Sequence, residues 1–311
     1  MDPGELLGDG DRVGAYVVRG VLGHGGMGAV YEVEAPDGAR RAMKAALIDR
    51  ADGGVAARRL AREGNALQLL EHPNVVAALD RLVAGGRLYL VMELVRGPSL
   101  RALLEDGALP PRRALVLTRQ ILDGVEHAHA RGVVHRDLKP ENVIVSAAGP
   151  AHDPYDRVKL LDFGLVKLRD DAAAMVGAGR LTRTGTTFGT PAYMAPEVAQ
   201  GRSIDGRADL YAIGVMLFEM LCGRRPFVAG DALALLRAQV SATPPRLADV
   251  CGDAWWCTPE LETLVGGALA KPPGDRFATA TAMRACLDDA FASLDRARDP
   301  HGAPAGDQSR P

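Results

Sequence analysis

The sequence lacks a marked excess of positive charge. Its 311 residues carry a formal net charge of −2, and 24% of them are charged. Domains that bind nucleic acid usually concentrate Lys and Arg into a strongly basic surface. The charge balance therefore argues against nucleic acid as a partner and leaves room only for a local basic patch.

Cysteine is scarce, and the few cysteines do not form a metal-binding pattern. No two are spaced as CxxC, and no group of histidines accompanies them. Structural zinc sites are usually built from such pairs. We therefore expect no structural zinc, and we interpret the cysteines as buried free thiols in a reducing compartment. They are Cys222, Cys251, Cys257 and Cys286.

No segment has the composition of a secretory signal or the length of a membrane span. Residues 1–5 lack a basic head and an apolar core. The most apolar stretch, residues 210–222, is interrupted by Glu219 and is too short to cross a bilayer. We expect a soluble, cytoplasmic protein without a membrane span, with a disordered tail at 295–311.

The most informative stretch is HRDLKPEN at residues 135–142, in which five of eight residues carry charge or can gain it. It lies between two apolar runs, 133–134 and 143–145, which we expect to form short buried strands. Strands on both sides would hold the loop rigidly. An acid, a cation and an amide on one fixed turn suit a reaction in which a proton leaves, negative charge grows and a metal is held. These residues are Asp137, Lys139 and Asn142.

A glycine-rich turn lies among the first predicted strands. GHGGMGAV at residues 23–30 contains GxGxxG, which alone is a weak signal. A dinucleotide-binding fold would begin a helix here, but residues 30–34 and 42–45 have the composition of strands. The pattern predicts an antiparallel meander whose first hairpin can close over phosphate groups. A plain flexible hairpin is the alternative.

Lys44 lies in an apolar predicted strand, and Glu63 lies on the apolar stripe of a helix predicted at 55–70. Leu60 and Leu67 flank Glu63 at spacings of three and four residues. An inward carboxylate needs a partner, because an unpaired buried charge costs on the order of several kcal/mol. Lys44 is the natural partner. The alternatives are that Lys44 extends to solvent and that Glu63 lies at the edge of the stripe and stays solvated.

Further polar residues have positions typical of a site. A strand predicted at 158–161 ends in Asp162, which can hold a metal or simply begin a turn. Asp209 lies in the first turn of a helix predicted at 207–222, where we expect it to cap backbone amides and suit the helix dipole. Residues 180–187 contain four threonines and two arginines, which suit a phosphorylation switch or, alternatively, a solvated loop.

Taken in order, these motifs resemble a eukaryotic-type (Hanks-type) serine/threonine protein kinase. They are the glycine turn at 23–30, AMK ending at Lys44, Glu63, HRDLKPEN at 135–142, DFG at 162–164, GTPAYMAPE at 189–197, Asp209 and Arg276. So many motifs in order make a chance match negligible, and the GGMG turn with HPNVV at 72–76 resembles bacterial members most.

The resemblance implies the bilobal α+β kinase fold, with a small antiparallel-sheet N-lobe containing one main helix and a larger, mostly helical C-lobe. Gly97-Pro98 follows the last predicted strand of the first part and suits a hinge. The predicted divisions are an extension at 1–13, a kinase domain at 14–294, its N-lobe at 14–95, a hinge at about 93–98, its C-lobe at 99–294 and the tail at 295–311.

For the nucleotide, the resemblance implies ATP with Mg²⁺, or with Mn²⁺ as an alternative. Lys44, steadied by Glu63, would pair the α- and β-phosphates, and Met92 stands at the gatekeeper position. The backbone of Glu93 and Val95 would bind the base. The full set implied for nucleotide binding is Leu22, Gly23, His24, Gly25, Gly26, Met27, Gly28, Ala29, Val30, Ala42, Lys44, Met92, Glu93 and Val95.

For the chemistry, the resemblance implies that Asp137 orients a substrate hydroxyl and accepts its proton. Lys139 would neutralise the transferring phosphoryl group, and Asn142 and Asp162 would hold the metal. Lys139 together with Thr190 is the pattern of Ser/Thr rather than tyrosine specificity.

For regulation, Arg136 directly precedes the catalytic aspartate, as in members activated by phosphorylation of the segment after DFG. Thr182 and Thr184 align best with the activating threonines of bacterial members. The residues implied to be structural are Glu197 and Arg276, as a buried ion pair, and Asp209.

The main hypothesis is an active kinase that phosphorylates Ser/Thr in proteins and its own activation segment, with a second copy acting in trans in a transient dimer as a further candidate. A pseudokinase scaffold or ATP-binding signalling module is the alternative, disfavoured because Lys44, Asp137, Asn142 and Asp162 are all present. A small-molecule phosphotransferase of related fold is disfavoured by the Ala-Pro-Glu segment at 195–197.

Overall fold

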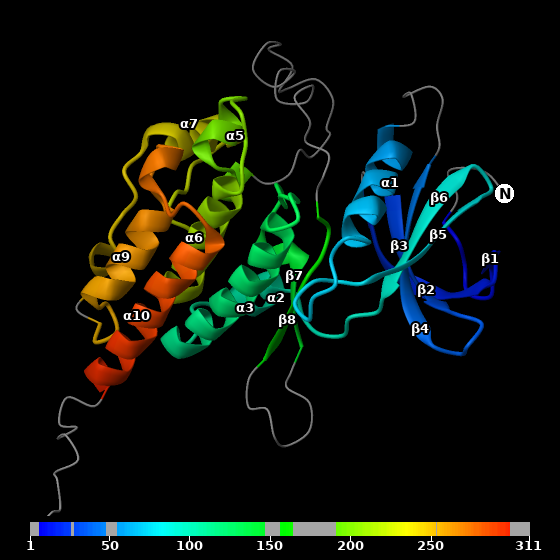
Figure 1. Cartoon of the computed structure of the whole chain (residues 1–311), viewed down its shortest axis with the longest axis horizontal. Helices are drawn as coiled ribbons and strands as arrows, with labels where there is room; N and C mark the ends of the chain where they lie inside the picture. The colour runs from blue at the N-terminus through cyan, green and yellow to red at the C-terminus, as the bar shows by residue number, and fades with distance from the viewer. Residues whose placement is uncertain are drawn as a thin grey trace, which may run out of the picture.

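The computed structural model describes residues 6–25, 28–47, 55–146, 156–163, 191–252 and 254–298. Figure 1 shows two parts side by side: a sheet with one helix against it, and a larger bundle of helices. The predicted bilobal α+β fold is therefore confirmed. Within the part of the chain that the structure describes, no helix combines the length and apolarity needed to cross a membrane.

All neighbouring strands of the first sheet are antiparallel. Their order is β1-β2-β3-β4-β6-β5, so that β2, β3 and β4 form the predicted meander with the glycine turn at its first hairpin. The strands are β1 (Arg12–Val13), β2 (Tyr16–Gly25), β3 (Gly28–Glu34), β4 (Arg40–Leu47), β5 (Ala78–Ala84) and β6 (Arg87–Glu93).

The two faces of this sheet contribute to different clusters of buried side chains. Leu88 and Leu90 of β6 lie in the same core as α1 (Val55–Leu67), whereas Tyr89 and Val91 lie in a smaller cluster. Successive side chains of a strand point to opposite faces, which explains the alternation and places α1 over one face.

The residues just before the boundary predicted at residue 14 pack against the N-lobe sheet. Leu7 and Val13 are buried in the smaller cluster of the sheet, and β1 pairs with β2. Residues 6–13 therefore belong to the N-lobe, because their apolar side chains complete one face of it.

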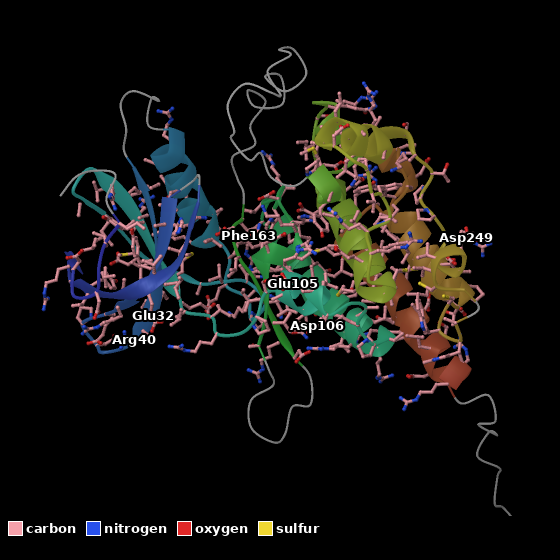
Figure 2. The ribbon with its side chains drawn as sticks, turned by 180° about the vertical axis from the view of Figure 1, so that it is seen from behind. Glu32, Arg40, Glu105, Asp106, Phe163 and Asp249 are labelled. Atoms are coloured by element: carbon pink, nitrogen blue, oxygen red, sulfur yellow. The ribbon has the colours of Figure 1, made fainter. Side chains whose placement is uncertain are left out.

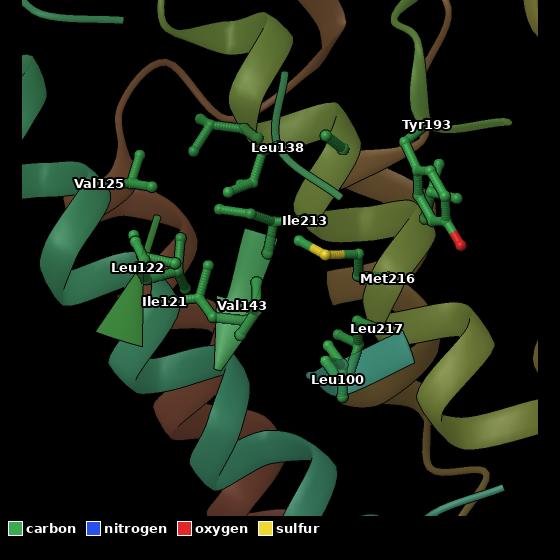
Figure 3. Packing of buried hydrophobic residues seen from close by; sticks show 14 of the residues in the cluster. Leu100, Ile121, Leu122, Val125, Leu138, Val143, Tyr193, Ile213, Met216 and Leu217 are labelled. Carbon is green, nitrogen blue, oxygen red and sulfur yellow. The ribbon is translucent and has the colours of Figure 1, made fainter. Parts of the chain in front are cut away.

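α6 (Arg207–Cys222) is the central helix of the second part, at the predicted position. Every residue from Ala208 to Leu221 is buried, as expected for a helix that is apolar all round. Figure 3 shows its Ile213 and Met216 among side chains of α3 and β7. The other elements are α2 (Leu100–Glu105), α3 (Pro111–His129), η1 (Pro140–Asn142), β7 (Val143–Ser146), β8 (Arg157–Leu160), η2 (Pro191–Tyr193), α5 (Pro196–Ala199), α7 (Ala232–Ser241), α8 (Leu247–Cys251), α9 (Pro259–Ala268), η3 (Pro273–Asp275) and α10 (Ala280–Arg298).

The strand predicted at Val133 and Val134 is absent from the structure. The N–H of Val133 donates to the carbonyl of Ala128 at the end of α3 (3.0 Å), and the N–H of His135 donates to Asp209 (2.8 Å). The amides there close a helix and bind a carboxylate instead of joining a ladder. The second predicted strand does form, as β7, and it pairs with β8.

The predicted tail begins too early. α10 continues through residues 295–298, where Asp295 pairs with Arg112, and Arg296 lies 3.0 Å from Glu260. These contacts tie the last turn of the helix to α3 and α9. The remaining predicted tail, residues 299–311, lies outside the described residues.

Candidate active site

The 135–142 loop holds its polar side chains on one short turn that ends in η1. Lys139 Nζ lies 2.8 Å from Asp137 Oδ2. Asn142 Nδ2 donates to the backbone carbonyl of Asp137 at 2.8 Å, and Asn142 is buried. The structure therefore brings the three predicted residues together: Lys139 contacts the carboxylate of Asp137, and Asn142 holds the backbone of Asp137.

Asp209 fixes the backbone of this loop from α6. Its two carboxylate oxygens accept the N–H groups of His135 and Arg136, both at 2.8 Å, and His129 Nε2 lies 2.8 Å from one of them. Burial alone would raise the pKa of Asp209, but the hydrogen bonds, led by that with His129, outweigh burial and hold the pKa below its ordinary value. The carboxylate is thus a charged anchor for the loop.

The prediction that Asp209 caps backbone amides of its own helix is wrong. Gly206 precedes α6 without a side-chain cap, and the carboxylate of Asp209 turns to the loop. Arg136 needs this support because its backbone is left-handed (φ 65°), a conformation that costs free energy for a residue with a side chain.

His135 joins the loop to the end of β8. Its Nε2 lies 2.9 Å from the carbonyl oxygen of Leu161, and since a carbonyl only accepts, Nε2 carries the proton. The His135 ring packs on Phe163 with centroids 4.6 Å apart. The N–H of Leu161 donates to the carbonyl of Asn142 at 2.8 Å. Asp162, between Leu161 and Phe163, is thereby held beside the loop; Figure 2 shows Phe163 near the junction of the two parts.

Lys44 of β4 reaches from the sheet to Asp162, with Nζ 2.8 Å from Oδ1. Asp162 has φ 52°, and it and Arg136 are the left-handed non-glycine residues of the described chain. Backbone strain of this kind concentrates at functional sites. Glu63, the partner predicted for Lys44, has its backbone in α1, but its side chain lies outside the described residues, so this pairing stays a prediction.

Predicted nucleotide-binding residues line adjacent strands of the sheet. Ala42 of β4 pairs with Met92 of β6, and Lys44 pairs with Val30 of β3. Ala42 and Met92 are both buried. The small Ala42 and the long Met92 thus lie side by side on neighbouring strands. Ala42 is on β4, the strand that also carries Lys44.

The segment after β6 presents backbone to the same region. The N–H of Glu93 donates to the carbonyl of Ala77 at 3.0 Å, so a ligand could contact Glu93 only through its carbonyl oxygen. Lys159 Nζ donates to Oε1 of the Glu93 side chain at 2.5 Å. Val95 is half-buried and packs against the core.

The glycine turn is open on one side and tightly packed on the other. Residues 22–24, Leu22, Gly23 and His24, are exposed at the end of β2, and Gly25 pairs with Gly28. A Cβ at Gly28 would lie 1.9 Å from the carbonyl oxygen of Ala45, and its φ is +128°, so only glycine fits there. Ala29 beside it is buried.

Other predicted site residues fall where the structure gives no description. Their roles stay predictions of the sequence. They are Gly26, Met27, Thr182, Thr184 and Thr190.

Arg136 lines a cavity of about 30 Å³ together with Asp137 and Tyr193. Its Nε is buried and has no hydrogen-bond partner among the described residues. A buried guanidinium N–H normally finds an acceptor, so this N–H is a donor available to an acceptor group.

The structure brings Arg276 and Glu197 together as a two-pronged ion pair. Nη1 and Nη2 of Arg276 each lie 2.7 Å from a carboxylate oxygen of Glu197, and both side chains are almost fully buried. Carbonyls of Ala270 and Lys271 accept further N–H groups of Arg276. The pair ties α5 to the segment that precedes α10.

A polar network beside the loop was not predicted. Arg101 of α2 lies 3.0 Å from Glu219 of α6 and 3.2 Å from Glu141 of the loop, and it contacts the hydroxyl of Tyr193. Burial, followed by the Glu219 charge, raises the pKa of the Tyr193 hydroxyl. The sole sequence signal was Glu219 itself, a carboxylate in the most apolar stretch; its partners lie up to 118 residues away.

With this geometry in place, the chain matches the family model described as "Protein kinase domain" over residues 16–287. It is 38% identical over 274 residues to the serine/threonine-protein kinase PkaA of Streptomyces coelicolor, covering 84% of this chain and 47% of that protein. It is 38% identical over 227 residues to the serine/threonine-protein kinase PknL of Mycobacterium tuberculosis, covering 73% and 53%.

Among solved structures, the chain is similar to the kinase domain of Mycobacterium tuberculosis PknI. The TM-score is 0.69 at 26% identity, and the match covers 92% of this chain and 100% of that one. The chain spans about half the length of the curated relatives named above, at 47% and 53% of them.

Proposed function

The chain belongs to the protein kinase family, as a Hanks-type serine/threonine member related to bacterial kinases, and on this premise we propose that it transfers the γ-phosphoryl group of ATP to serine and threonine hydroxyls of proteins. One observation carries the proposal. Asp137, in contact with Lys139, is held on the same turn as Asn142, beside an Asp162 that Lys44 contacts from the other lobe. Catalysis by protein kinases is almost entirely such positioning and charge stabilisation.

Asp137 orients the acceptor hydroxyl and accepts its proton as the new oxygen–phosphorus bond forms. Lys139, 2.8 Å from Asp137 Oδ2, places a positive charge where negative charge grows on the transferred group. The anchoring of His135 and Arg136 by Asp209 keeps this turn in place without reorganisation during the reaction.

Lys44 binds nucleotide phosphates, and the wall of Ala42, Met92 and Val30 receives the base. Asn142 and Asp162 fit a hard cation such as Mg²⁺ or Mn²⁺, because both offer oxygen atoms. The Nδ2 of Asn142 is used by Asp137, which leaves its Oδ1 as the ligand atom. A bound cation supplies charge neutralisation for the phosphates. Among the described residues, no cluster of three or more His, Cys, Asp or Glu offers another metal site.

Arg136 links the site to phosphorylation of the segment that follows DFG at residues 162–164. Phosphate on Thr182 or Thr184 would supply acceptor oxygens for the buried Arg136 Nε. Autophosphorylation, including transfer in trans in a transient dimer, would place it there. Peptide mapping by mass spectrometry tests this link: active protein without phosphate between residues 180 and 190 contradicts it.

The substrates, partners and cellular location of the whole protein are proposals, since the chain spans about half of the named relatives. Protein substrates with Ser/Thr acceptors follow from the family, and a cytoplasmic location stays a prediction for cell fractionation to test. Incubation with ATP, Mg²⁺ and a generic protein substrate tests the function, with mass spectrometry of the products. Phosphate on serine or threonine supports a protein kinase; nucleotide binding without any transfer favours the pseudokinase alternative.

A further inference from the structure

Two of the four cysteines meet at the C-terminal end of α6. Cys251 Sγ donates a hydrogen bond to Cys222 Sγ at 3.0 Å, although the residues are 29 positions apart. Both are partly buried free thiols. Cys222 belongs to α6, and Cys251 belongs to α8. Figure 2 shows Asp249, also in α8, toward the edge of the helical part.

The backbone fixes this approach. Each cysteine is the last residue of its helix, and each is followed by a glycine with positive φ. Gly223 is left-handed at φ 66° and ψ 3°, whereas Gly252 has φ 67° with an extended ψ of −159°. Left-handed glycine ends a helix sharply, as at Gly223, and at Gly252 the positive φ is a backbone conformation that glycine adopts readily. The two thiols are therefore presented from the ends of two helices and do not depend on a long loop for their contact.

We propose that Cys222 and Cys251 are an oxidisable pair that a small peroxide converts to an intramolecular disulfide tying α8 to the C-terminal end of α6. A disulfide bond is about 2.05 Å long, so the two sulfurs need to approach by about 1 Å. The predicted interpretation of these residues as buried free thiols would then hold only under reducing conditions.

The chemistry balances with hydrogen peroxide as the oxidant. One thiol attacks an oxygen of the peroxide, the O–O bond breaks, and a sulfenic acid and one water form. The second thiol then attacks the sulfenic sulfur, the S–O bond breaks, and the disulfide and a second water form. Two electrons and two protons leave the thiols, and the peroxide is reduced to two waters.

The surroundings make this oxidation slow. Burial, followed by the hydrogen bond with Cys251, raises the pKa of the Cys222 thiol, and burial raises that of Cys257 to about 11. Because the thiolate is the reactive form, such thiols react slowly at neutral pH. The pair therefore responds to sustained exposure to peroxide, and Cys257, near enough for the Cys251 charge to affect it, is the competing partner.

The experiment treats the full chain with hydrogen peroxide, blocks the remaining thiols and maps peptides by mass spectrometry, beside a thermal unfolding scan. We expect a linked Cys222–Cys251 peptide and a Tm raised by about 5 °C or more, because the cross-link restricts the unfolded chain. Dithiothreitol should reverse both changes. No activity is measured, so the result is independent of the proposed function.

The variants Cys222→Ser and Cys251→Ser should each lose the linked peptide and the rise in Tm. Because either substitution removes the disulfide, the test still works if one of the two variants fails to fold. Cys286→Ser, on α10, is the matched control and should keep both. A dominant link to Cys257, sulfinic acids without a link, or a link without a change in Tm would overturn the proposal.

Discussion

Lys44 and Asp162 are 118 residues apart in the sequence, and their side chains meet with Nζ 2.8 Å from Oδ1. The lysine comes from a strand of the N-lobe sheet and the aspartate from the end of β8 in the other lobe. The contact places the cation proposed for the phosphates next to the carboxylate proposed for the metal. The two lobes are thus joined at the point where the nucleotide would bind.

Lys44→Met tests the importance of this cation. We expect kcat/KM to fall by about 10²- to 10³-fold, the usual cost of removing one preorganised charge from a transition state. Steady-state phosphorylation of a generic protein substrate measures it. Arg40→Met removes a positive charge from the same strand and should leave kcat/KM close to that of the wild type. Equal losses in the two variants would contradict a specific role for Lys44.

Asp209→Asn tests the anchor of the loop. The carboxylate accepts two backbone N–H groups on two oxygens, whereas an asparagine offers one oxygen and one donor, so one N–H loses its acceptor. We expect the free energy of unfolding to fall by about 1–3 kcal/mol, with a lower kcat. Urea unfolding and steady-state kinetics measure the two, with the exposed Asp249→Asn as control. An unchanged kcat would mean that the loop keeps its shape without this anchor.

Arg276→Met tests the buried ion pair. Removing the arginine leaves Glu197 as an uncompensated buried charge, which we expect to lower the free energy of unfolding by about 3–5 kcal/mol. The double variant Arg276→Met with Glu197→Leu should recover much of this loss, since it removes the stranded charge. Denaturant unfolding of both variants makes the comparison. A double variant as unstable as the single one would show that the arginine acts through its backbone contacts instead.

Lys271 gives the stability a dependence on alkaline pH. Burial, followed by the Arg276 charge, lowers its pKa from 10.5 to about 8, while its Nζ donates to the carbonyl of Gln239 at 2.8 Å. Between these pH values the unfolded chain binds more protons at this group than the folded chain does, so its contribution to stability increases as pH rises. The free energy of unfolding of wild type minus that of Lys271→Met should therefore rise from pH 8 to pH 10.5. A flat difference would contradict the lowered pKa.

The local motifs could be predicted because their geometry depends on a few neighbouring residues. Asp137, Lys139 and Asn142 share one turn, and the mostly apolar run of α6 indicates a buried helix with the observed bounds, Arg207–Cys222. The first hairpin could also be predicted, and its Gly28 is required by close contact with the backbone of Ala45.

Contacts between distant segments could not be predicted in the same way. In the sequence, the backbone of its own helix is the nearest partner for Asp209, which predicts a helix cap. The loop residues that it binds, His135 and Arg136, lie 74 and 73 residues earlier. Val133 had the composition of a strand, but its N–H is used by the end of α3. α2 is six residues long, too short for a periodic pattern, and is marked mainly by the Ser99 cap.

The assignment as an active kinase is tested most directly by γ-labelled ATP and Mg²⁺, with and without a generic protein substrate, using wild type and Asp137→Asn together. We expect the wild type to label itself and the substrate, and the variant to bind nucleotide normally while transfer falls by several orders of magnitude. Asp106→Asn, at an exposed aspartate, should match the wild type. A wild type that binds ATP without transferring label, or an Asp137→Asn variant with wild-type turnover, would contradict the assignment.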